Sequence, residues 1–245
     1  MKIERILQFL LLLFFMVQLY GQTAPLKISD DLEISQLTDN CFLHVSYYDL
    51  ENAAHFPANG MVFVDHGEAI ILDTPWRDEE TNLLIEWIQN ELDVKIIGCV
   101  VNHWHIDCMG GLKAIHRAGI ASYAHEKTRQ IASEKQLPLP EHVFKDSLII
   151  PVGQKQLVCK YLGAAHTLDN IVVWQPDDKV LFAGCMVKAL NWRTLGNMRD
   201  GDHEDYPITL KRVLNEFPDC NIVIPGHGRV GDRSLITHTI SLCDN

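Results

Sequence analysis

The chain contains the stretch Val100-Val101-Asn102-His103-Trp104-His105-Ile106-Asp107-Cys108-Met109-Gly110-Gly111-Leu112, around which its other motifs can be arranged. Immediately upstream, Val94–Cys99 is a short apolar run rich in β-branched residues, which predicts a buried strand. Downstream, Leu112 and Ile115 begin a helical pattern. The stretch is therefore predicted to be a strand-to-helix loop, where rigid elements can hold a functional site open to solvent.

Two histidines and one carboxylate of this loop have the spacing of metal ligands. In an extended segment, residues i and i+2 point to the same side, so His103 and His105 face the same way, and Asp107 follows two residues later. Imidazole and carboxylate groups suit a divalent metal, zinc in particular. The alternative is a polar loop whose histidines contact only water or backbone. That alternative explains a lone histidine well, but the pattern H-x-H-x-D favours a metal site.

Three later strand ends each carry a candidate ligand beside Gly or Ala. They are Gly163-Ala164-Ala165-His166-Thr167, Phe182-Ala183-Gly184-Cys185-Met186 and Ile224-Pro225-Gly226-His227-Gly228. Small residues beside a ligand let the backbone approach a metal closely. Packing could explain any one of these strand ends, but it does not readily explain all four, counting the stretch that carries His103 and His105. The six candidate ligands suffice for two zinc ions with water completing each shell; they are His103, His105, Asp107, His166, Cys185 and His227.

Residues 1–21 are predicted to be a secretory signal peptide. Lys2 and Arg5 form a short positive region, Ile6–Tyr20 is almost continuously apolar, and the small residue Gly21 follows. The alternative is a transmembrane anchor, but the apolar run is shorter than the ~20 residues of a span and lacks a basic flank after it. We therefore expect an exported, periplasmic protein without a stable membrane anchor, cleaved after Gly21 or Ala24.

Composition limits the kinds of partner and the number of domains that we expect for residues 22–245. The formal net charge is −11, and loss of Lys2, Glu4 and Arg5 removes +1, which leaves −12. Because so acidic a chain repels phosphates and shows no basic cluster, we expect no nucleic-acid partner. The segment is long enough for one domain with a sizeable core and has no linker or internal repeat. We expect a monomer, since no coiled-coil pattern is present.

Hydrophobic periodicity predicts an α/β chain whose strands cluster in two halves. Expected strands of the first half are Cys41–Tyr48, Gly60–Asp65 and Ala69–Asp73, with a ten-residue link at Leu50–Asn59. Expected strands of the second half are Gln156–Leu162, Ile171–Trp174, Lys179–Phe182 and Ile222–Ile224. Expected helices begin at Asp78, Leu112, Glu126, Pro207 and Ser234. Two strand clusters with flanking helices predict a sandwich of two sheets covered outside by helices.

Seven cysteines in an exported chain could form disulfides, but their number is odd and no C-x-x-C occurs. Most of those outside the candidate site lie in or beside apolar runs and are expected to be small core residues: Cys41, Cys99, Cys159 and Cys220. Cys108 differs, because it directly follows Asp107. We expect Cys108 to lie near the second metal without binding it.

The order of motifs H-W-H-I-D-C, G-A-A-H-T, A-G-C and P-G-H-G resembles the metallo-β-lactamase superfamily. It is most similar to the class B subclass in which a three-histidine site lies beside an Asp-Cys-His site. The resemblance runs from about Cys41 onward and is closest at His166–Trp174 and Leu181–Lys188. It implies a four-layer αβ/βα sandwich, in which two mixed β-sheets are flanked by helices.

The resemblance also implies which zinc each ligand binds. The first zinc would be held by His103, His105 and His166, and the second by Asp107, Cys185 and His227. A zinc-bound hydroxide, oriented by Asp107, would attack the β-lactam carbonyl, and the second zinc would receive the charge of the leaving nitrogen. The implied activity is hydrolysis of penicillins, cephalosporins and carbapenems, which gives antibiotic resistance.

Further positions match the family outside the ligand set. Lys188 resembles a lysine that pairs with the substrate carboxylate, and Asn197 an asparagine that helps bind the lactam carbonyl. Their alternatives are a solvated surface lysine and ordinary turn chemistry. Asp73 looks like a buried acid that supports the ligands, and Ala53–Phe56 like part of a flap over the substrate.

Three other functions stay open. A thioester or lactone hydrolase of the same fold would typically show H-x-H-x-D-H and a bridging aspartate, where this chain has Cys108 and Cys185. A di-iron oxidoreductase is disfavoured because a thiolate at Cys185 prefers zinc in an exported protein. A non-catalytic zinc-binding protein would carry the same ligands without hydrolysing anything.

Overall fold

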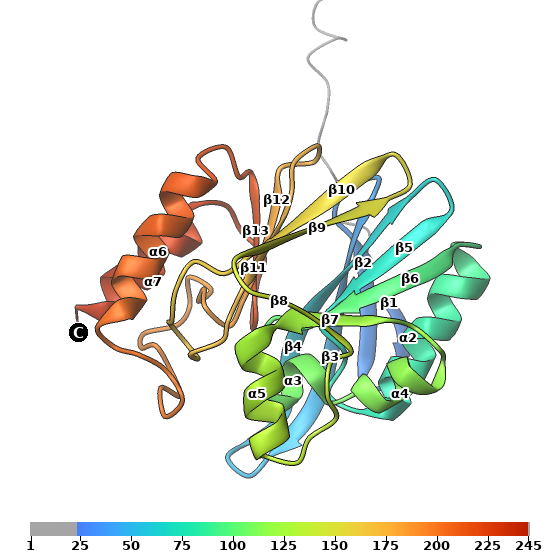
Figure 1. Cartoon of the computed structure of the whole chain (residues 1–245), viewed down its shortest axis with the longest axis horizontal. Helices are drawn as coiled ribbons and strands as arrows, with labels where there is room; N and C mark the ends of the chain where they lie inside the picture. The colour runs from blue at the N-terminus through green and yellow to red at the C-terminus, as the bar shows by residue number, and fades with distance from the viewer. Residues whose placement is uncertain (1–23, 245) are drawn as a thin grey trace, which may run out of the picture.

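The computed structural model describes residues 24–244, whose strands form one eight-stranded and one five-stranded sheet (Figure 1). The predicted signal peptide, residues 1–21, lies outside the described residues. Within the described range, none of the helices combines the length and the apolar character that crossing a membrane requires.

The first sheet follows the order of the chain. It contains β1 (Leu26–Ser29), β2 (Leu32–Gln36), β3 (Cys41–Leu50), β4 (Ala53–Asp65), β5 (Glu68–Leu72), β6 (Lys95–Val100), β7 (Ser122–His125) and β8 (His142–Phe144). The strands from β1 to β5 pair antiparallel, and those from β5 to β8 pair parallel.

The second sheet has the order β13-β12-β11-β10-β9. It contains β9 (Ser147–Val152), β10 (Lys155–Lys160), β11 (Val172–Gln175), β12 (Val180–Gly184) and β13 (Ile222–Pro225). Only the pair β12–β13 is parallel among these described strands, so both sheets are mixed.

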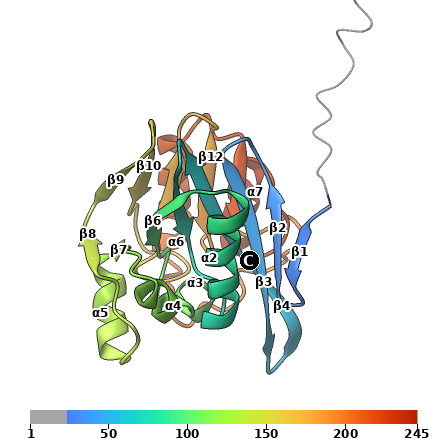
Figure 2. The ribbon, with the colours of Figure 1, turned by 90° about the vertical axis from the view of Figure 1, so that its right-hand side faces the viewer.

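Helices cover the outer face of each sheet. The first sheet is accompanied by α2 (Asp78–Glu91), α3 (Ile106–Met109), α4 (Leu112–Arg117) and α5 (Glu126–Glu134), and the second by α6 (Asp205–Glu216) and α7 (Ser234–Cys243). In Figure 2, α2 and α4 lie in front of the sheets, and α6 and α7 lie behind them. The predicted four-layer α/β sandwich is confirmed.

Side-chain alternation explains why the two sheets stack. In β5, Ile70 packs between the sheets, whereas Ile71 packs outward with Leu84 of α2. In β12, Phe182 packs between the sheets and Leu181 packs outward beneath α6 and α7. Apolar side chains therefore fill three layers, and central strands such as β5 and β12 are buried on both faces.

The predicted link at Leu50–Asn59 is wrong. The strands β3 and β4 continue through it and join by a two-residue turn, with Leu50 opposite Ala53. Alanine and asparagine favour strands only weakly, which hid the pattern. Cross-strand rings compensate, because Tyr47 stacks on His55 with ring centroids 4.1 Å apart.

Several short elements were not predicted from the sequence: β1, β2, β7, β8, β9 and α3. The helix α3 has four residues and contains Asp107, which we expected on a loop. The other predicted strands and helices are confirmed to within a few residues. Cys41, Cys99, Cys159 and Cys220 are buried free thiols, as expected.

Candidate metal centre

Candidate ligands gather where parallel strands end. His103 follows β6, Cys185 follows β12, and His227 follows β13. The carboxyl ends of parallel strands share one edge of a sheet, which is where ligands bind in α/β proteins. Because the two sheets are stacked, both edges border one site.

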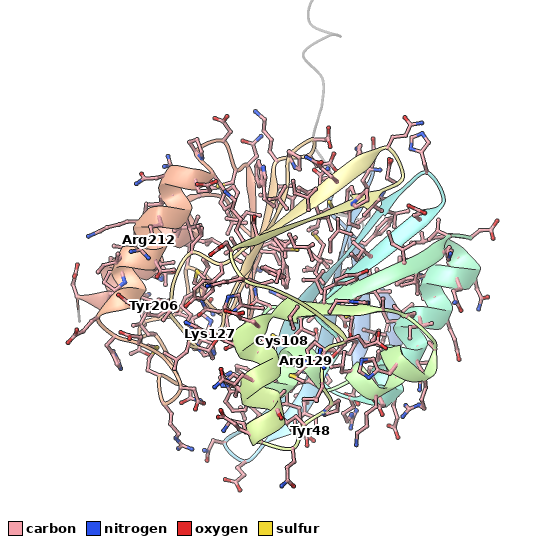
Figure 3. All side chains as sticks on the ribbon, in the orientation of Figure 1. Tyr48, Cys108, Lys127, Arg129, Tyr206 and Arg212 are labelled. Atoms are coloured by element: carbon pink, nitrogen blue, oxygen red, sulfur yellow. The ribbon has the colours of Figure 1, made fainter. Side chains whose placement is uncertain are left out.

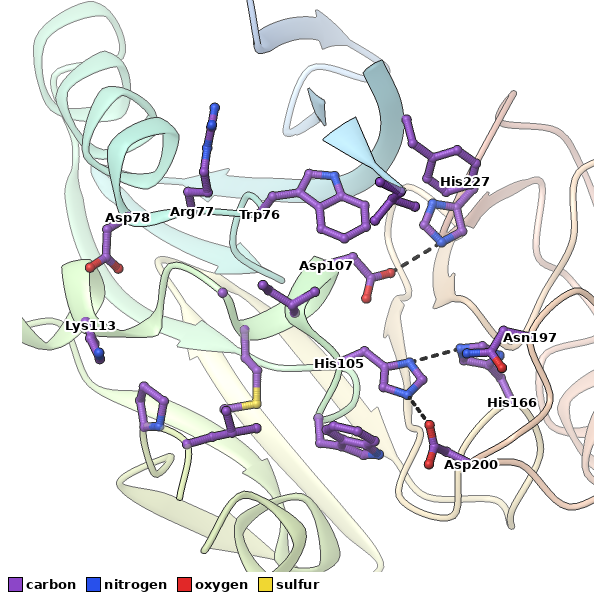
Figure 4. A pocket seen from close by; sticks show the side chains of 18 of the residues that line it. Trp76, Arg77, Asp78, His105, Asp107, Lys113, His166, Asn197, Asp200 and His227 are labelled. Carbon is purple, nitrogen blue, oxygen red and sulfur yellow. Dashed lines mark hydrogen bonds and ion pairs between the residues drawn. The ribbon is translucent and has the colours of Figure 1, made fainter. Parts of the chain in front are cut away.

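Three histidines, His103, His105 and His166, converge in a first cluster, and Figure 4 shows two of them, His105 and His166. The Nδ1 atom of His105 lies 3.0 Å from His103 Nε2 and 3.3 Å from His166 Nε2. Burial lowers the pKa of His103 to about 3 and holds the pKa of His166 well below its usual value. Neutral imidazole nitrogens this close offer lone pairs to a shared cation.

A second cluster joins a carboxylate, a thiol and an imidazole. The Oδ2 atom of Asp107 lies 3.2 Å from Cys185 Sγ and 3.3 Å from His227 Nε2. The Sγ atom of Cys185 lies 3.3 Å from His227 Nε2. The three donor atoms are thus in mutual contact in the interior.

Electrostatics give the second cluster a surplus of negative charge. Burial acts to raise the pKa of Asp107, but the hydrogen bond from His227 and the charge of that imidazole hold it well below the usual value. The pKa of the Cys185 thiol is lowered, first by a hydrogen bond from Cys108. Burial opposes charging of His227, yet Cys185 and Asp107 raise its pKa well above the usual value. Two anions around one imidazolium leave a net charge that a divalent cation can neutralise.

These donor sets fit zinc. Zinc binds nitrogen, thiolate sulfur and carboxylate oxygen in closed clusters of this kind. Each cluster brings together three such donors, and Gly226 permits the approach, because a Cβ there would collide with Cys185 Sγ. In the first cluster, ring nitrogens face one another instead of facing hydrogen-bond partners. This arrangement is also expected where a cation binds between them.

Hydrogen bonds orient the ligand rings. The Nδ1 atom of His227 donates to Pro57 O at 2.7 Å, which leaves Nε2 for the cluster. The Nε2 atom of His105 donates to Asp200 Oδ2 at 3.1 Å, which leaves Nδ1. The Nδ1 atom of His103 lies 3.1 Å from Asn102 Oδ1.

Asp73 and Asp200 support the ligands from behind. Asp73 is buried, and its Oδ1 accepts the backbone N–H of Asn102 at 2.6 Å, in agreement with the supporting role expected for it. Sequence reasoning missed Asp200, which is 95 residues from its partner His105. Its only signal in the sequence is that it shares a loop with Asn197.

Cys108 reaches the first cluster from behind. Its Sγ atom lies 3.1 Å from His103 Nδ1, and it also hydrogen-bonds to Cys185. Burial raises the pKa of Cys108 well above its usual value, so this thiol stays protonated. Cys108 thus lies between the two clusters.

A cavity of about 990 Å³ opens over both clusters. Aromatic and aliphatic side chains form much of its wall: Leu50, Phe56, Trp76, Trp104, Ile106, Met109 and Trp192. Lys188 and Asn197 also line it. Lys188 is 4% exposed, its Nζ donates to Cys185 O at 2.9 Å, and burial lowers its pKa. Asn197 Oδ1 accepts the backbone N–H of Arg199 at 3.2 Å, so ordinary turn chemistry is present as well.

Six of the eight predicted site residues therefore line one cavity, and the other two, His103 and Cys185, contact the lining residues His105 and His227. A volume near 1,000 Å³ accommodates a drug-sized molecule, with apolar walls for its body and a few polar groups to orient it. Such a site can bind an anionic small molecule beside the candidate metal ligands.

Comparisons with known proteins agree with this geometry. The family model described as Metallo-beta-lactamase superfamily matches residues 54–227. A protein of Bacteroides fragilis named Metallo-beta-lactamase type 2 is 42% identical over 230 residues, covering 94% of this chain and 92% of its own length. A Bacillus cereus protein of the same name is 32% identical over 213 residues, covering 86% and 82%.

Solved structures are similar in the same way. The metallo-beta-lactamase from Pontibacter korlensis has a TM-score of 0.84 and 34% identity, covering 87% of this chain and 99% of that chain. The DIM-1 metallo-beta-lactamase exposed to ceftazidime has a TM-score of 0.84 and 34% identity, covering 87% and 97%.

Proposed function

The chain belongs to the metallo-beta-lactamase superfamily and is a β-lactam hydrolase, and we propose that it opens the ring amide of penicillins, cephalosporins and carbapenems at a site for two zinc ions. The observation that carries the proposal is the contact between the two ligand clusters. Asp107 belongs to the second cluster, yet its Oδ1 atom lies 4.0 Å from His103 Nε2 of the first. Two metals would thus share one cavity.

The first zinc is assigned to the three-histidine cluster and the second to the Asp-Cys-His cluster. The donors are His103, His105 and His166 for the first, and Asp107, Cys185 and His227 for the second. When bound, zinc supplies Lewis acidity, which lowers the pKa of water toward ~7 and polarises a carbonyl oxygen.

Asp107 orients the attacking water. Its Oδ2 is held by Cys185 and His227, so the carboxylate is fixed while Oδ1 faces the first cluster. A carboxylate held in this way can accept a hydrogen bond from water and hold its proton at Oδ1 until the ring nitrogen leaves. The side chain therefore acts in positioning and in proton transfer.

Lys188 and Asn197 bind the substrate's polar groups. The ammonium of Lys188 is buried at the cavity wall, where it pairs with the carboxylate that penicillins and cephalosporins carry. Asn197 donates its amide N–H to the lactam carbonyl. Phe56 and Trp76 contact the apolar side groups and exclude water from the ring.

We also propose that the chain is exported to the periplasm after cleavage of residues 1–21, so that residues 22–245 form the mature domain. Support comes from the short positive region and the apolar run of the sequence. Sequencing the N-terminus of the protein recovered from the periplasm is the test. A first residue of Gln22 or Pro25 is expected, and an intact Met1 would contradict the proposal.

The test of the function is the hydrolysis of nitrocefin with measured metal content. We expect turnover by protein carrying two zinc ions, loss of turnover with a chelator, and recovery on addition of zinc. Hydrolysis of a thioester or a lactone but not of nitrocefin would favour the other hydrolases. Absence of all hydrolysis by zinc-loaded protein would favour a non-catalytic zinc-binding protein.

A further inference from the structure

A buried carboxylate close to the site takes no part in the mechanism above. Asp169 is 0% exposed and lies three residues after His166. Its Oδ2 atom accepts the backbone N–H of Trp104 at 3.0 Å. Trp104 is the residue between His103 and His105, so Asp169 holds the backbone that spaces two ligands of the first cluster.

The contact is one of a pair that flanks His103. On its other side, the backbone N–H of Ile171 donates to Asn102 O at 3.0 Å. Residues 102 and 104 are thus both tied to the segment 169–171, with the carboxylate of Asp169 in place of a backbone carbonyl. These ties join the loop after β6 in the first sheet to the loop before β11 in the second.

The burial of Asp169 is costly for the fold, because it raises the pKa of the carboxyl group and so opposes the charged form. Hydrogen bonds from Thr128 and Thr167 act in the opposite direction and favour the charge. A buried carboxylate supplied with donors in this way has a role that burial alone does not explain.

The helix α5 and the residue that follows it make further contacts with the same loop and with the segment before Asp169. At its C-terminal end, Lys135 Nζ lies over the ring of Trp104, 4.2 Å from the centroid. At its first turn, Lys127 Nζ donates to Tyr161 OH at 2.7 Å, and Figure 3 labels this lysine on α5. The hydroxyl of Tyr161 in turn donates to Leu168 O at 3.1 Å, next to Asp169. Trp104 is therefore held at its amide and at its ring.

We propose that Asp169 is a positioning residue of the three-histidine site, which fixes the spacing of His103 and His105 through the amide of Trp104. The inference rests on the proposed zinc assignment. Without this acceptor, the Trp104 amide loses its partner and the two imidazoles no longer share a fixed orientation. Affinity for metal would then fall at the first site and not at the second.

The experiment compares Asp169→Ala, Asp169→Leu and Asp169→Asn with the unaltered protein, all loaded with cobalt(II). Cobalt in the second site gives a sulfur-to-metal charge-transfer band through Cys185, whereas the first site contributes only ligand-field bands. Competition with a chelator then yields an affinity for each site. Leucine fills the volume of aspartate without an acceptor, so the fold is retained if alanine disrupts it.

Asp65→Ala is the matched control. Asp65 is 5% exposed and accepts the backbone N–H of Gln154 at 2.7 Å, so it is also a buried carboxylate bound to an amide. It lies eight residues along β4 from Pro57, which contacts His227, and therefore roughly 26 Å from the site. Its loss tests the general effect of removing such a carboxylate.

We expect Asp169→Ala and Asp169→Leu to weaken the first site by about 10–100-fold, the usual effect of losing a group that orients a ligand. The charge-transfer band and the second-site affinity should stay unchanged, Asp169→Asn should recover most of the loss, and Asp65→Ala should alter neither site. Equal losses of affinity at both sites, or no loss of first-site affinity in Asp169→Leu, would overturn this inference and leave the proposed function standing. Unaltered protein that binds no metal would instead overturn the proposed function.

Discussion

At the scale of single residues, Cys185 links the metal centre to the fold. Its thiol contacts Asp107 and His227, and its backbone carbonyl accepts the hydrogen bond of Lys188. A change at this position therefore tests the proposed second metal site separately from the proposed first site.

We expect Cys185→Ser to lower turnover by more than ~10-fold while leaving the fold intact. Serine removes the soft thiolate that zinc prefers but is nearly the same size. Steady-state kinetics and circular dichroism measure the two effects. Cys159→Ser is the control, because Cys159 is buried between the sheets away from the ligands. Near-normal turnover of Cys185→Ser would show that the second site is wrongly assigned.

Lys188→Met should raise KM for substrates that carry the ring carboxylate by about 10–100-fold, because a hydrogen bond to a charged group is worth ~1.5–3 kcal/mol. Methionine keeps the length of the chain and removes the charge. Kinetics with a penicillin and with its methyl ester provide the measurement. If Lys188→Met and the unaltered protein discriminate the acid from the ester equally, Lys188 does not bind the carboxylate.

His44 makes stability depend on pH. It is fully buried, its Nε2 donates to Asp73 O at 3.2 Å, and burial lowers its pKa to about 4 from 6.5. Between these values the unfolded chain binds a proton that the folded protein does not. The free energy of unfolding should therefore fall as the pH drops from 6.5 to 4, by about 3 kcal/mol from this residue.

The measurement is urea unfolding of the zinc-loaded protein and of His44→Gln across this pH range. Protons linked to metal binding are the same in both proteins and cancel in the difference. Parallel pH profiles would show that His44 does not titrate in this way.

The convergence of the candidate ligands could be predicted from sequence, because each motif carries its own local pattern of small residues and donors. Asp200 and Asp169 could not, because each acts on a residue far along the chain, 95 and 65 residues away respectively. An aspartate in a loop is ordinary until the fold shows what it contacts.

At the scale of elements, the long hairpin of β3 and β4 forms part of the cavity. Phe56 of β4 lies 4.9 Å from the ring of His227, and Leu50 of β3 lines the same wall. The pairing of these strands therefore sets both the shape of the cavity and the environment of one ligand.

Gly60 allows His44 to be buried in this hairpin, since the two residues are paired across β3 and β4. A Cβ at Gly60 would collide with the imidazole and lie 2.8 Å from Leu72 O. We expect Gly60→Ala to lower the free energy of unfolding by about 1–3 kcal/mol, as overpacking does. Thermal unfolding is the measurement, with His44→Ala/Gly60→Ala as the control. If the cost of Gly60→Ala is the same in the His44→Ala background, the collision is not its cause.

Elements with strong periodicity were predictable, and marginal ones were not. The helix α2 places Leu84 and Ile88 on one face and three acids in its first turn. This is the usual sequence pattern of an amphipathic helix. By contrast, β8 has three residues, two of them exposed, and exists because β7 offers it a partner. Such pairing depends on the neighbouring strand, so the three residues of β8 carry no recognisable strand pattern of their own.

At the scale of the whole molecule, the metal centre lies on the seam between the sheets. The first sheet supplies His103, His105 and Asp107, and the second supplies the other candidate ligands. Any ion bound there connects the two halves of the protein.

Removal of metal should therefore lower the melting temperature. A ligand present at 100 times its Kd stabilises by about 2.7 kcal/mol, which corresponds to about 5–10 °C for a chain of this size. Calorimetry with zinc and with a chelator measures the shift. Cys185→Ser should show a smaller shift than the unaltered protein, and equal shifts would mean that the second site binds no metal.

The long separations between ligands have a kinetic consequence. His105 and His166 are 61 residues apart, Asp107 and Cys185 78, and Cys185 and His227 42. Loops of this length close late, because their entropy is lost before distant contacts compensate for it. In refolding, an ion added early would meet only the three donors that are close along the backbone, His103, His105 and Asp107. Metal capture should thus accompany the docking of the two sheets and report on the last step of folding.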